Sequence, residues 1–167
     1  MRVALLQFMA AAKKFEDLDA WQLASQLEDE VFRMTSTGGA NRDFEFRDQI
    51  RASASSAPSN IAEGFGRYYP NENAPYVRTA KASLHETQNH LLSGKRKRYF
   101  SADDFEKAWL LAKRALGAAT RYLQYLERCG RNVPGQPPRD GKIRTRNREP
   151  GTKNHEPGTG NQEPGTG

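Results

Sequence analysis

Histidine is the side chain best suited to acid–base or metal chemistry near neutral pH. The chain has three histidines, at positions 85, 90 and 155. A di-iron site in a helical bundle needs a Glu-x-x-His pattern on two helices. Ala82 and Thr87 stand where those glutamates would have to be, three residues before His85 and His90. The histidine spacing therefore does not predict a metal site.

Cysteine and glycine patterns add no further chemistry. Cys129 is the single cysteine, which excludes an intrachain disulfide and a multi-cysteine zinc site. Neither standard glycine-rich phosphate loop is present in the sequence. We therefore expect no catalytic residue, no metal and no cofactor, and we interpret the protein as not an enzyme.

A run of four cations indicates binding chemistry instead. The run consists of Lys95, Arg96, Lys97 and Arg98, and Tyr99 and Phe100 follow it directly. Adjacent cations bind phosphates, and aromatic rings beside them stack on bases. In the alternative reading this is a solvated loop between two helices, with both aromatic rings covering the core.

Charge is distributed unevenly along the chain, whose net charge is +6. Residues 13–50 carry 5 Lys and Arg against 9 Asp and Glu, whereas residues 81–130 carry 10 against 5. Lys113, Arg114 and Arg121 extend the basic segment, and we include them in the predicted nucleic-acid-binding surface. An acidic first helix facing a basic third and fourth helix of a neighbouring copy would favour head-to-tail self-assembly.

Four amphipathic helices must position these residues. The pattern predicts helices over residues 18–35, 42–63, 74–92 or beyond, and from just after Ser101 to Gly130. Asp17 and Ser101 are expected to act as N-caps. Because no strand pattern competes, the sequence predicts an all-α fold, an antiparallel up-down four-helix bundle.

One motif in the second predicted helix combines a proline, an amide, a carboxylate and glycines. Pro58 should kink or break the helix, because its ring clashes with the carbonyl of Ala54. Asn60 and Glu63 could then cap the segment beyond the break, or form a hydrogen-bond network with Arg67 or Ser83. Gly64 and Gly66 should then end the helix. We interpret this motif, which comprises Pro58, Asn60, Glu63, Gly64 and Arg67, as structural.

The two ends of the chain differ from the middle. Residues 131–167 contain six of the nine prolines and seven of the 14 glycines, and three near-copies of a seven-residue unit end the chain. This composition predicts a disordered tail. Residues 1–14 form an N-terminal extension, interpreted as an accessory helix or an over-long start rather than a signal peptide. The expected bundle occupies residues 15–130, and no apolar run is long enough for a membrane span.

Several segments resemble a known family. They are Asp48-Gln-Ile-Arg51, Ser56-Ala-Pro-Ser-Asn-Ile-Ala-Glu-Gly-Phe-Gly-Arg67, Phe15-Glu-Asp-Leu-Asp-Ala-Trp21 and Ala80-Lys-Ala-Ser-Leu-His-Glu86. They are similar to the four-helix-bundle proteins encoded within intervening sequences of bacterial 23S rRNA genes. The resemblance covers residues 15–129. Ala57 departs from the family pattern, which has a larger aliphatic residue there, and Ala82 replaces a usual glycine.

The resemblance implies a cytoplasmic bacterial protein that assembles into a homopentameric ring and has no established reaction. A more distant relative is the accessory protein of diversity-generating retroelements, which is associated with a reverse transcriptase and with nucleic acid. We therefore expect a non-enzymatic homo-oligomer that binds RNA or DNA through the basic surface. The alternative is a protein-interaction scaffold or accessory subunit, for instance to a reverse transcriptase.

Overall fold

The computed structural model describes residues 12–67 and 69–131, and every element within them is helical. The elements in order are η1 (Phe15–Asp17), α2 (Asp19–Met34), α3 (Gly38–Arg42), α4 (Phe44–Phe65), α5 (Pro70–Arg96) and α6 (Ala102–Arg131). The predicted C-terminal tail and most of the predicted N-terminal extension lie outside the described residues.

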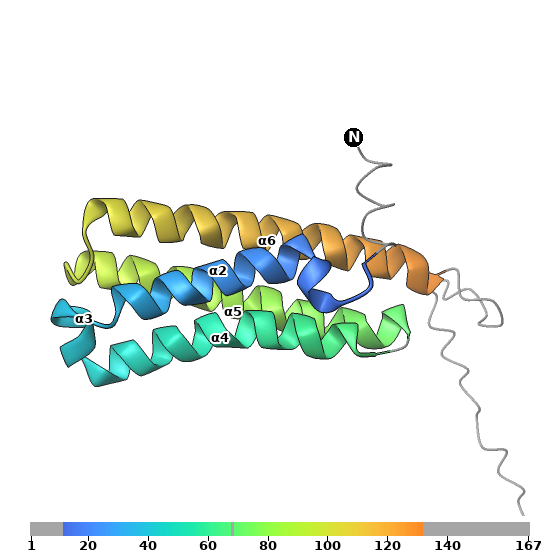
Figure 1. Cartoon of the computed structure of the whole chain (residues 1–167), viewed down its shortest axis with the longest axis horizontal. Helices are drawn as coiled ribbons and strands as arrows, with labels where there is room; N and C mark the ends of the chain where they lie inside the picture. Colours follow the sequence, from blue (N-terminus) through green and yellow to red (C-terminus); the bar gives the residue numbers. More distant parts are fainter. Residues whose placement is uncertain (1–11, 68, 132–167) are drawn as a thin grey trace, which may run out of the picture. The chain divides into compact units, whose positions relative to one another are not determined.

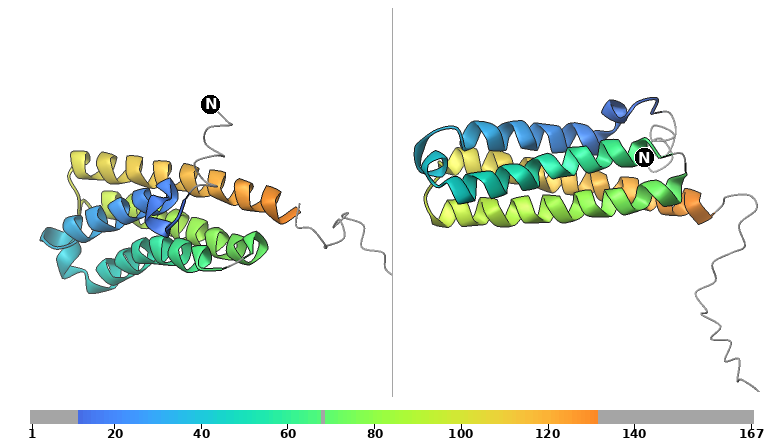
Figure 2. Two further views of the ribbon diagram at one scale, coloured as in Figure 1. Left: turned by 45° about the vertical axis from the view of Figure 1, so that its right-hand side comes forward. Right: turned by 90° about the horizontal axis from the view of Figure 1, so that it is seen from below.

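The four long helices form an antiparallel bundle. The chain reverses direction at each connection between them (Figures 1 and 2). α2 and α5 lie diagonally opposite each other. α2 packs against α4 and α6, and α5 packs against the same two helices. The predicted all-α, up-down architecture is confirmed. The basic run at residues 95–98 therefore lies at the end of α5, and the further basic residues at 113, 114 and 121 lie on the neighbouring helix α6.

The core consists of the apolar stripes that the periodicity predicts. On α4 the stripe is Phe46, Ile50, Ala54, Ala57 and Ile61, and all five side chains are buried. The helix α6 contributes many alanines, together with Phe105, Leu123 and Leu126. These small residues bring the helices close together, and the longer aliphatic and aromatic side chains fill the remaining space.

The beginnings of two helices differ from expectation. Asp17 is not the N-cap of α2, because it lies in the preceding turn η1, where its carboxylate accepts the backbone N–H groups of Lys13 and Lys14 at 3.0 and 3.2 Å. α5 begins at Pro70, four residues earlier than expected, since proline is well suited to the first helical position. Ser101 does cap α6, and its hydroxyl accepts the backbone N–H of Asp104 at 3.1 Å.

Of the two outcomes expected at Pro58, a kink or a break, the break does not occur. α4 continues through the proline to Phe65. Side chains just beyond the proline donate to nearby carbonyls: Ser59 to Ser55 and Asn60 to Ser56, each at 2.8 Å. The carbonyl that loses its backbone donor is that of Ala54, one residue before this pair, so these bonds add side-chain donors to the turn that follows it. Asn60 is thus bonded within the helix and does not start a new one.

Two glycines allow α5 to approach its neighbours. A Cβ at Gly64 would lie 2.5 Å from Asn73 Oδ1 and 2.8 Å from Tyr76 Cβ, so the absence of a side chain brings α4 and α5 together. α4 ends at Phe65 with Gly66 as its C-cap, between and at the two glycines that were expected to end it. A Cβ at Gly94 would lie 2.2 Å from Phe100 Cε2. This glycine therefore leaves space for the aromatic ring that follows the basic run.

A row of hydroxyl groups crosses the α4–α5 interface. Thr87 Oγ1 lies 3.0 Å from Ser53 Oγ, and Ser56 Oγ lies 2.9 Å from Ser83 Oγ. Ser53, Ser83 and Thr87 are buried. We call these four residues the hydroxyl seam; it pairs polar groups within an interface of small side chains.

No helix in the described part of the chain is long and apolar enough to cross a membrane.

Candidate nucleic-acid interface

The predicted basic run forms the end of α5 and the turn into α6. Lys95 and Arg96 belong to the last turn of α5, and Lys97 is its C-cap. Tyr99 N–H donates to the carbonyl of Gly94 at 2.9 Å, and Arg98 N–H donates to that of Lys95 at 3.0 Å. These two bonds define a Schellman C-cap, a motif that usually has glycine at the left-handed position.

Two of the four cations have partners within the protein. Lys97 Nζ lies 2.8 Å from Asp43 Oδ2, and the Tyr99 hydroxyl donates to the same oxygen at 2.8 Å. Together with the Phe46 backbone N–H, these bonds lower the pKa of Asp43 to about 2, and Asp43 raises the pKa of Lys97. Lys95 Nζ lies 4.0 Å from the centre of the Phe105 ring. Both lysines therefore hold the turn in place.

The two arginines of the run are available for binding. Arg96 and Arg98 are exposed, and neither guanidinium has a partner among the described residues. Arg98 has φ +58°, the one positive φ of a non-glycine residue in the described chain. An L-residue in this conformation costs about 1–2 kcal/mol, which glycine would avoid. An exposed arginine in a strained position suggests a role for its side chain.

Both aromatic residues after the run cover the core, as the alternative reading proposed. Tyr99 and Phe100 are half-buried and contact Phe46, with ring centroids 5.2 and 6.0 Å away. A Cβ at Gly39 would lie 2.8 Å from the Tyr99 ring, so the short helix α3 also packs there. Neither ring is therefore free to stack on a base without leaving the core.

The basic residues predicted on the last helix form a second, separate patch. Lys113, Arg114 and Arg121 lie on α6 and line a hollow of about 370 Å³ between α2 and α6. All three are exposed and have no partner in the described part of the chain. Arg121 lies about 30 Å beyond the start of α6 at 1.5 Å per residue. The structure thus does not unite these residues with the turn in one cluster.

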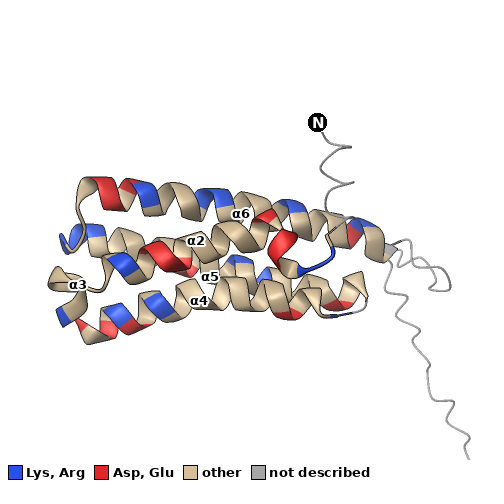
Figure 3. Cartoon of the chain, in the orientation of Figure 1, with Lys and Arg blue, Asp and Glu red and all other residues tan. Residues whose placement is uncertain are grey.

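The cations of α6 have a regular spacing, which the sequence interpretation missed. Basic residues recur every seven positions, at Lys107, Arg114, Arg121 and Arg128. In a straight helix this places them in one slightly drifting row, about 10.5 Å apart. Residues 107–126 contain no Asp or Glu, and Figure 3 shows blue segments recurring along α6. Counting in sevens along the sequence would have revealed the row.

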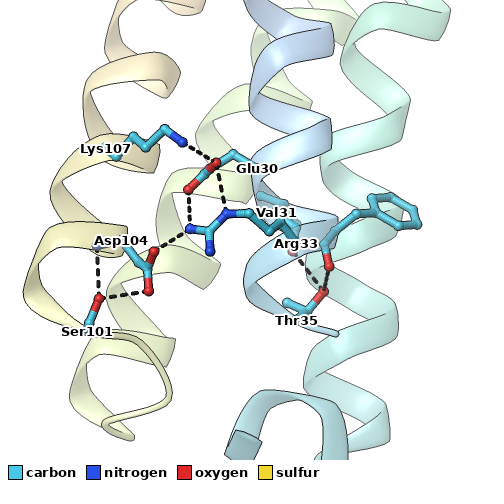
Figure 4. A network of polar contacts seen from close by, with 8 residues as sticks. Glu30, Val31, Arg33, Thr35, Ser101, Asp104 and Lys107 are labelled. Carbon is cyan, nitrogen blue, oxygen red and sulfur yellow. Dashed lines mark hydrogen bonds and ion pairs between the residues drawn. The ribbon is translucent and has the colours of Figure 1, made fainter. Parts of the chain in front are cut away.

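The first member of this row is neutralised by the acidic helix beside it. Glu30 is 5% exposed and accepts hydrogen bonds from Lys107 Nζ at 2.8 Å and from Arg33 Nε at 3.2 Å. Arg33 also bonds to Asp104 (Figure 4). The Arg33 hydrogen bond, and then that of Lys107, lower the pKa of Glu30 against the effect of burial. Part of the acidic charge of α2 is thus paired within the subunit.

The proline motif lies apart from both basic patches. Arg67 donates to Glu63 at 2.9 Å and contacts the Tyr76 hydroxyl, with its guanidinium over the Tyr76 ring. Asn60 Nδ2 lies 3.1 Å from Ser56 Oγ, which leads to Ser83 in the hydroxyl seam. Pro58 is buried. These contacts join α4 to α5 and are consistent with a structural role.

A cluster of arginines and aromatic rings lies along α2 and α4. Phe32 and Phe44 are 40% and 64% exposed. The guanidinium of Arg51 lies 4.7 Å from the Phe32 ring centre, and that of Arg47 lies 4.8 Å from that of Phe44. Large exposed rings paired with arginine are common in protein interfaces. We call these four residues the α2–α4 aromatic patch.

Within residues 12–67 and 69–131, no three His, Cys, Asp or Glu side chains are grouped so that they could hold a metal ion. His85 is exposed, and His90 lies against Phe46 with its Nε2 3.8 Å from the Glu86 carboxylate. Cys129 is a half-buried free thiol.

Comparison with known proteins gives one relationship. No curated protein matches the chain. The family of proteins described as 23S rRNA-intervening sequence protein matches residues 16–117, which is more than half of the chain and includes α2 to α5 and half of α6. The chain therefore belongs to the 23S rRNA-intervening sequence protein family.

Proposed function

We propose that this protein is a non-enzymatic, cytoplasmic homo-oligomer, a ring of five copies, that binds RNA through the exposed cations of α5 and α6. The observation that carries the proposal is the concentration of unpaired cations on these helices. Arg96, Arg98, Lys113, Arg114 and Arg121 all face solvent without an ion-pair partner in the described chain. Unpaired exposed cations supply the phosphate contacts on which nucleic-acid affinity depends.

A ring would strengthen binding of this kind. One subunit offers two separate patches of two or three cations, which is a small number for tight binding. Symmetry repeats both patches around the ring, and several modest contacts on one RNA raise the overall affinity through effective concentration. The proposal thus links self-assembly to RNA binding, and the two properties are measured separately.

The test compares two variants of equal charge. The first replaces Arg96, Arg98, Arg114 and Arg121 with Gln. The second replaces Lys13, Lys14, Arg42 and Lys81 with Gln; these four are not among the proposed RNA contacts and also have no side-chain partner in the described chain. Lys95 and Lys97 are left unchanged, because they hold the turn.

Binding to a structured RNA is measured as a function of salt concentration. We expect the first variant to lose most of the affinity and about 3 from the log–log salt slope for each subunit that contacts the RNA, at roughly 0.7–0.9 per phosphate contact. The second variant should bind nearly as the parent does. Equal loss in both variants would refute the surface, and absence of RNA binding by the parent would refute the function. Mass measurement should give five times 18.8 kDa, and a monomer would refute the ring.

The α2–α4 aromatic patch favours a second candidate function. In this alternative the protein is a scaffold or accessory subunit, for instance of a reverse transcriptase, and Phe44 inserts into the partner. Replacement of Phe44 by Ser should then abolish capture of the enzyme and leave RNA binding unchanged. Enzyme capture that is independent of Phe44 would contradict this assignment.

A further inference from the structure

We infer that the hollow between α2 and α6 is a binding site for a phosphodiester group of the RNA backbone; the inference rests on the proposed function and assigns it a site. Its α6 wall consists of Lys113, Arg114, Gly117 and Arg121. On the α2 side, Gln26 and Asp19 line the same hollow.

The charges around the hollow favour an anion. Lys113, Arg114 and Arg121 contribute three positive charges, and the one carboxylate lining the hollow is that of Asp19. No ion pair joins these cations to Asp19 or to any other described residue. Three like charges gathered without partners repel one another, and a bound phosphate relieves this repulsion.

Gly117 lies between Arg114 and Arg121, and close packing does not explain why this position is a glycine. Glycine is disfavoured against alanine in the interior of a helix such as α6. At Gly39, Gly64 and Gly94 a Cβ would lie within 3.0 Å of another residue, so these positions need glycine. At Gly117 a Cβ would meet one neighbouring atom, Arg121 Nη1, at 3.4 Å, an ordinary contact distance. What the glycine provides is an open floor between Arg114 and Arg121.

The dimensions suit a phosphate held by two arginines. Arg114 and Arg121 are about 10.5 Å apart along the helix axis, since they are separated by seven residues. Extended arginine side chains on either side of Gly117 can therefore converge on one group. The hollow of about 370 Å³ holds a phosphodiester group with several waters, at roughly 30 Å³ per water.

The lining predicts binding without base preference. No aromatic side chain lines the hollow, and bases are held by stacking on aromatic rings. Contacts to phosphate fix the position of the strand and carry no sequence information directly. A neighbouring hollow also includes Arg114, but its other two cations, Arg33 and Lys107, are paired with Glu30, and Asp29 lines it as well.

The experiment uses the full-length protein and a 20-nucleotide oligouridylate, with binding followed by fluorescence anisotropy. Gly117→Glu places a carboxylate in the hollow, and Gly117→Gln is the uncharged control of the same size. We expect the Glu variant to bind at least tenfold more weakly than the Gln variant. Oligoadenylate should bind within about threefold of oligouridylate.

A second variant avoids any change to the helix backbone. Arg114→Gln/Arg121→Gln should lower the log–log salt slope by about 1.4, at 0.7 per cation for a single strand. The matched control, Arg42→Gln/Lys81→Gln, should leave the slope nearly unchanged. Circular dichroism and solution mass are measured for all variants to verify folding and assembly.

The outcomes separate the inference from the proposed function. If the parent binds RNA and the Gly117→Glu and double-arginine variants bind as it does, the hollow is not the site, although the protein is still an RNA binder. If the parent binds neither the oligouridylate nor the structured RNA, the proposed function itself fails; if it binds the structured RNA alone, the inference fails, because a phosphodiester site would hold either strand. A change of solution mass in Gly117→Glu would identify the hollow as a contact between subunits and would overturn the inference.

Discussion

Two glycine-to-alanine substitutions test how closely the basic turn packs on the bundle. Gly94 and Gly117 both lie inside helices, so alanine gains about 1 kcal/mol of helix propensity at either position. Their surroundings differ. A Cβ at Gly94 would lie 2.2 and 2.8 Å from two atoms of the Phe100 ring and 2.9 Å from Phe46 Cζ. At Gly117 the space is open except for Arg121 Nη1 at 3.4 Å.

The expected effects therefore have opposite signs. Gly117→Ala should raise the free energy of unfolding by about 1 kcal/mol. In Gly94→Ala the Phe100 ring must move, and the overpacking costs about 1–3 kcal/mol. With the propensity gain subtracted, we expect this variant to be less stable than the parent by about 1 kcal/mol. The propensity gain is common to both, so the two variants should differ by the overpacking cost, about 1–3 kcal/mol.

Urea unfolding followed by circular dichroism measures the difference. All proteins are compared at one concentration, because the stability of an oligomer depends on concentration. Equal slopes of free energy against urea would show that the midpoints report stability alone. If Gly94→Ala were as stable as Gly117→Ala, the close contact between Gly94 and Phe100 would be refuted as the reason for the glycine.

Three further predictions follow from single contacts. Arg98→Gly should raise the free energy of unfolding by about 0.5–1 kcal/mol in a urea titration, because glycine adopts φ +58° without strain, and should weaken RNA binding. Tyr122→Phe should lower the same quantity by about 1–3 kcal/mol, since it removes the acceptor 2.7 Å from the buried Asn73 amide. Asp43 has a pKa lowered from 3.8 to about 2, so its pairing with Lys97 stabilises the fold above about pH 4 and is lost as pH falls toward 2. The stability difference between parent and Asp43→Asn should therefore shrink over that range.

Each prediction has an outcome that contradicts it. An Arg98→Gly variant that is more stable and binds RNA as tightly as the parent would exclude a binding role for this side chain. A neutral Tyr122→Phe would show that the Asn73 amide finds another acceptor. A stability difference for Asp43→Asn that stays constant down to pH 2 would contradict the lowered pKa.

The helices and most of the core could be predicted because local periodicity determines them. Residues such as Phe46 and Ile50 fall on one face at helical spacing, and burial follows from that face. The short helix α3 was missed because its two glycines, Gly38 and Gly39, resemble a terminator. Pro58 does not break its helix, because the flanking residues Ala57 and Ile61 are fully buried in the core, and a local rule about proline does not weigh that packing.

The candidate site was predicted less completely, for a related reason. Lys97 is basic in the sequence, but its partner Asp43 lies 54 residues away, and periodicity carries no information about such pairs. The same holds for Lys107 and Glu30, which are 77 residues apart. The residues left available, Arg96 and Arg98 at the turn and Arg114 and Arg121 on α6, become evident once the paired cations are known.

The hydroxyl seam has a consequence for where the basic turn lies. An interface of small side chains alone would pack almost equally well if α5 slid along α4 by one helical turn, about 5.4 Å. Such a slide would separate Ser53 from Thr87 and Ser56 from Ser83 and break the two hydroxyl hydrogen bonds between the helices, at about 0.5–1.5 kcal/mol each. The seam therefore selects one alignment of the two helices. Because the turn at residues 97–101 continues directly from α5, that alignment also determines how far the exposed arginines project beyond the end of the bundle.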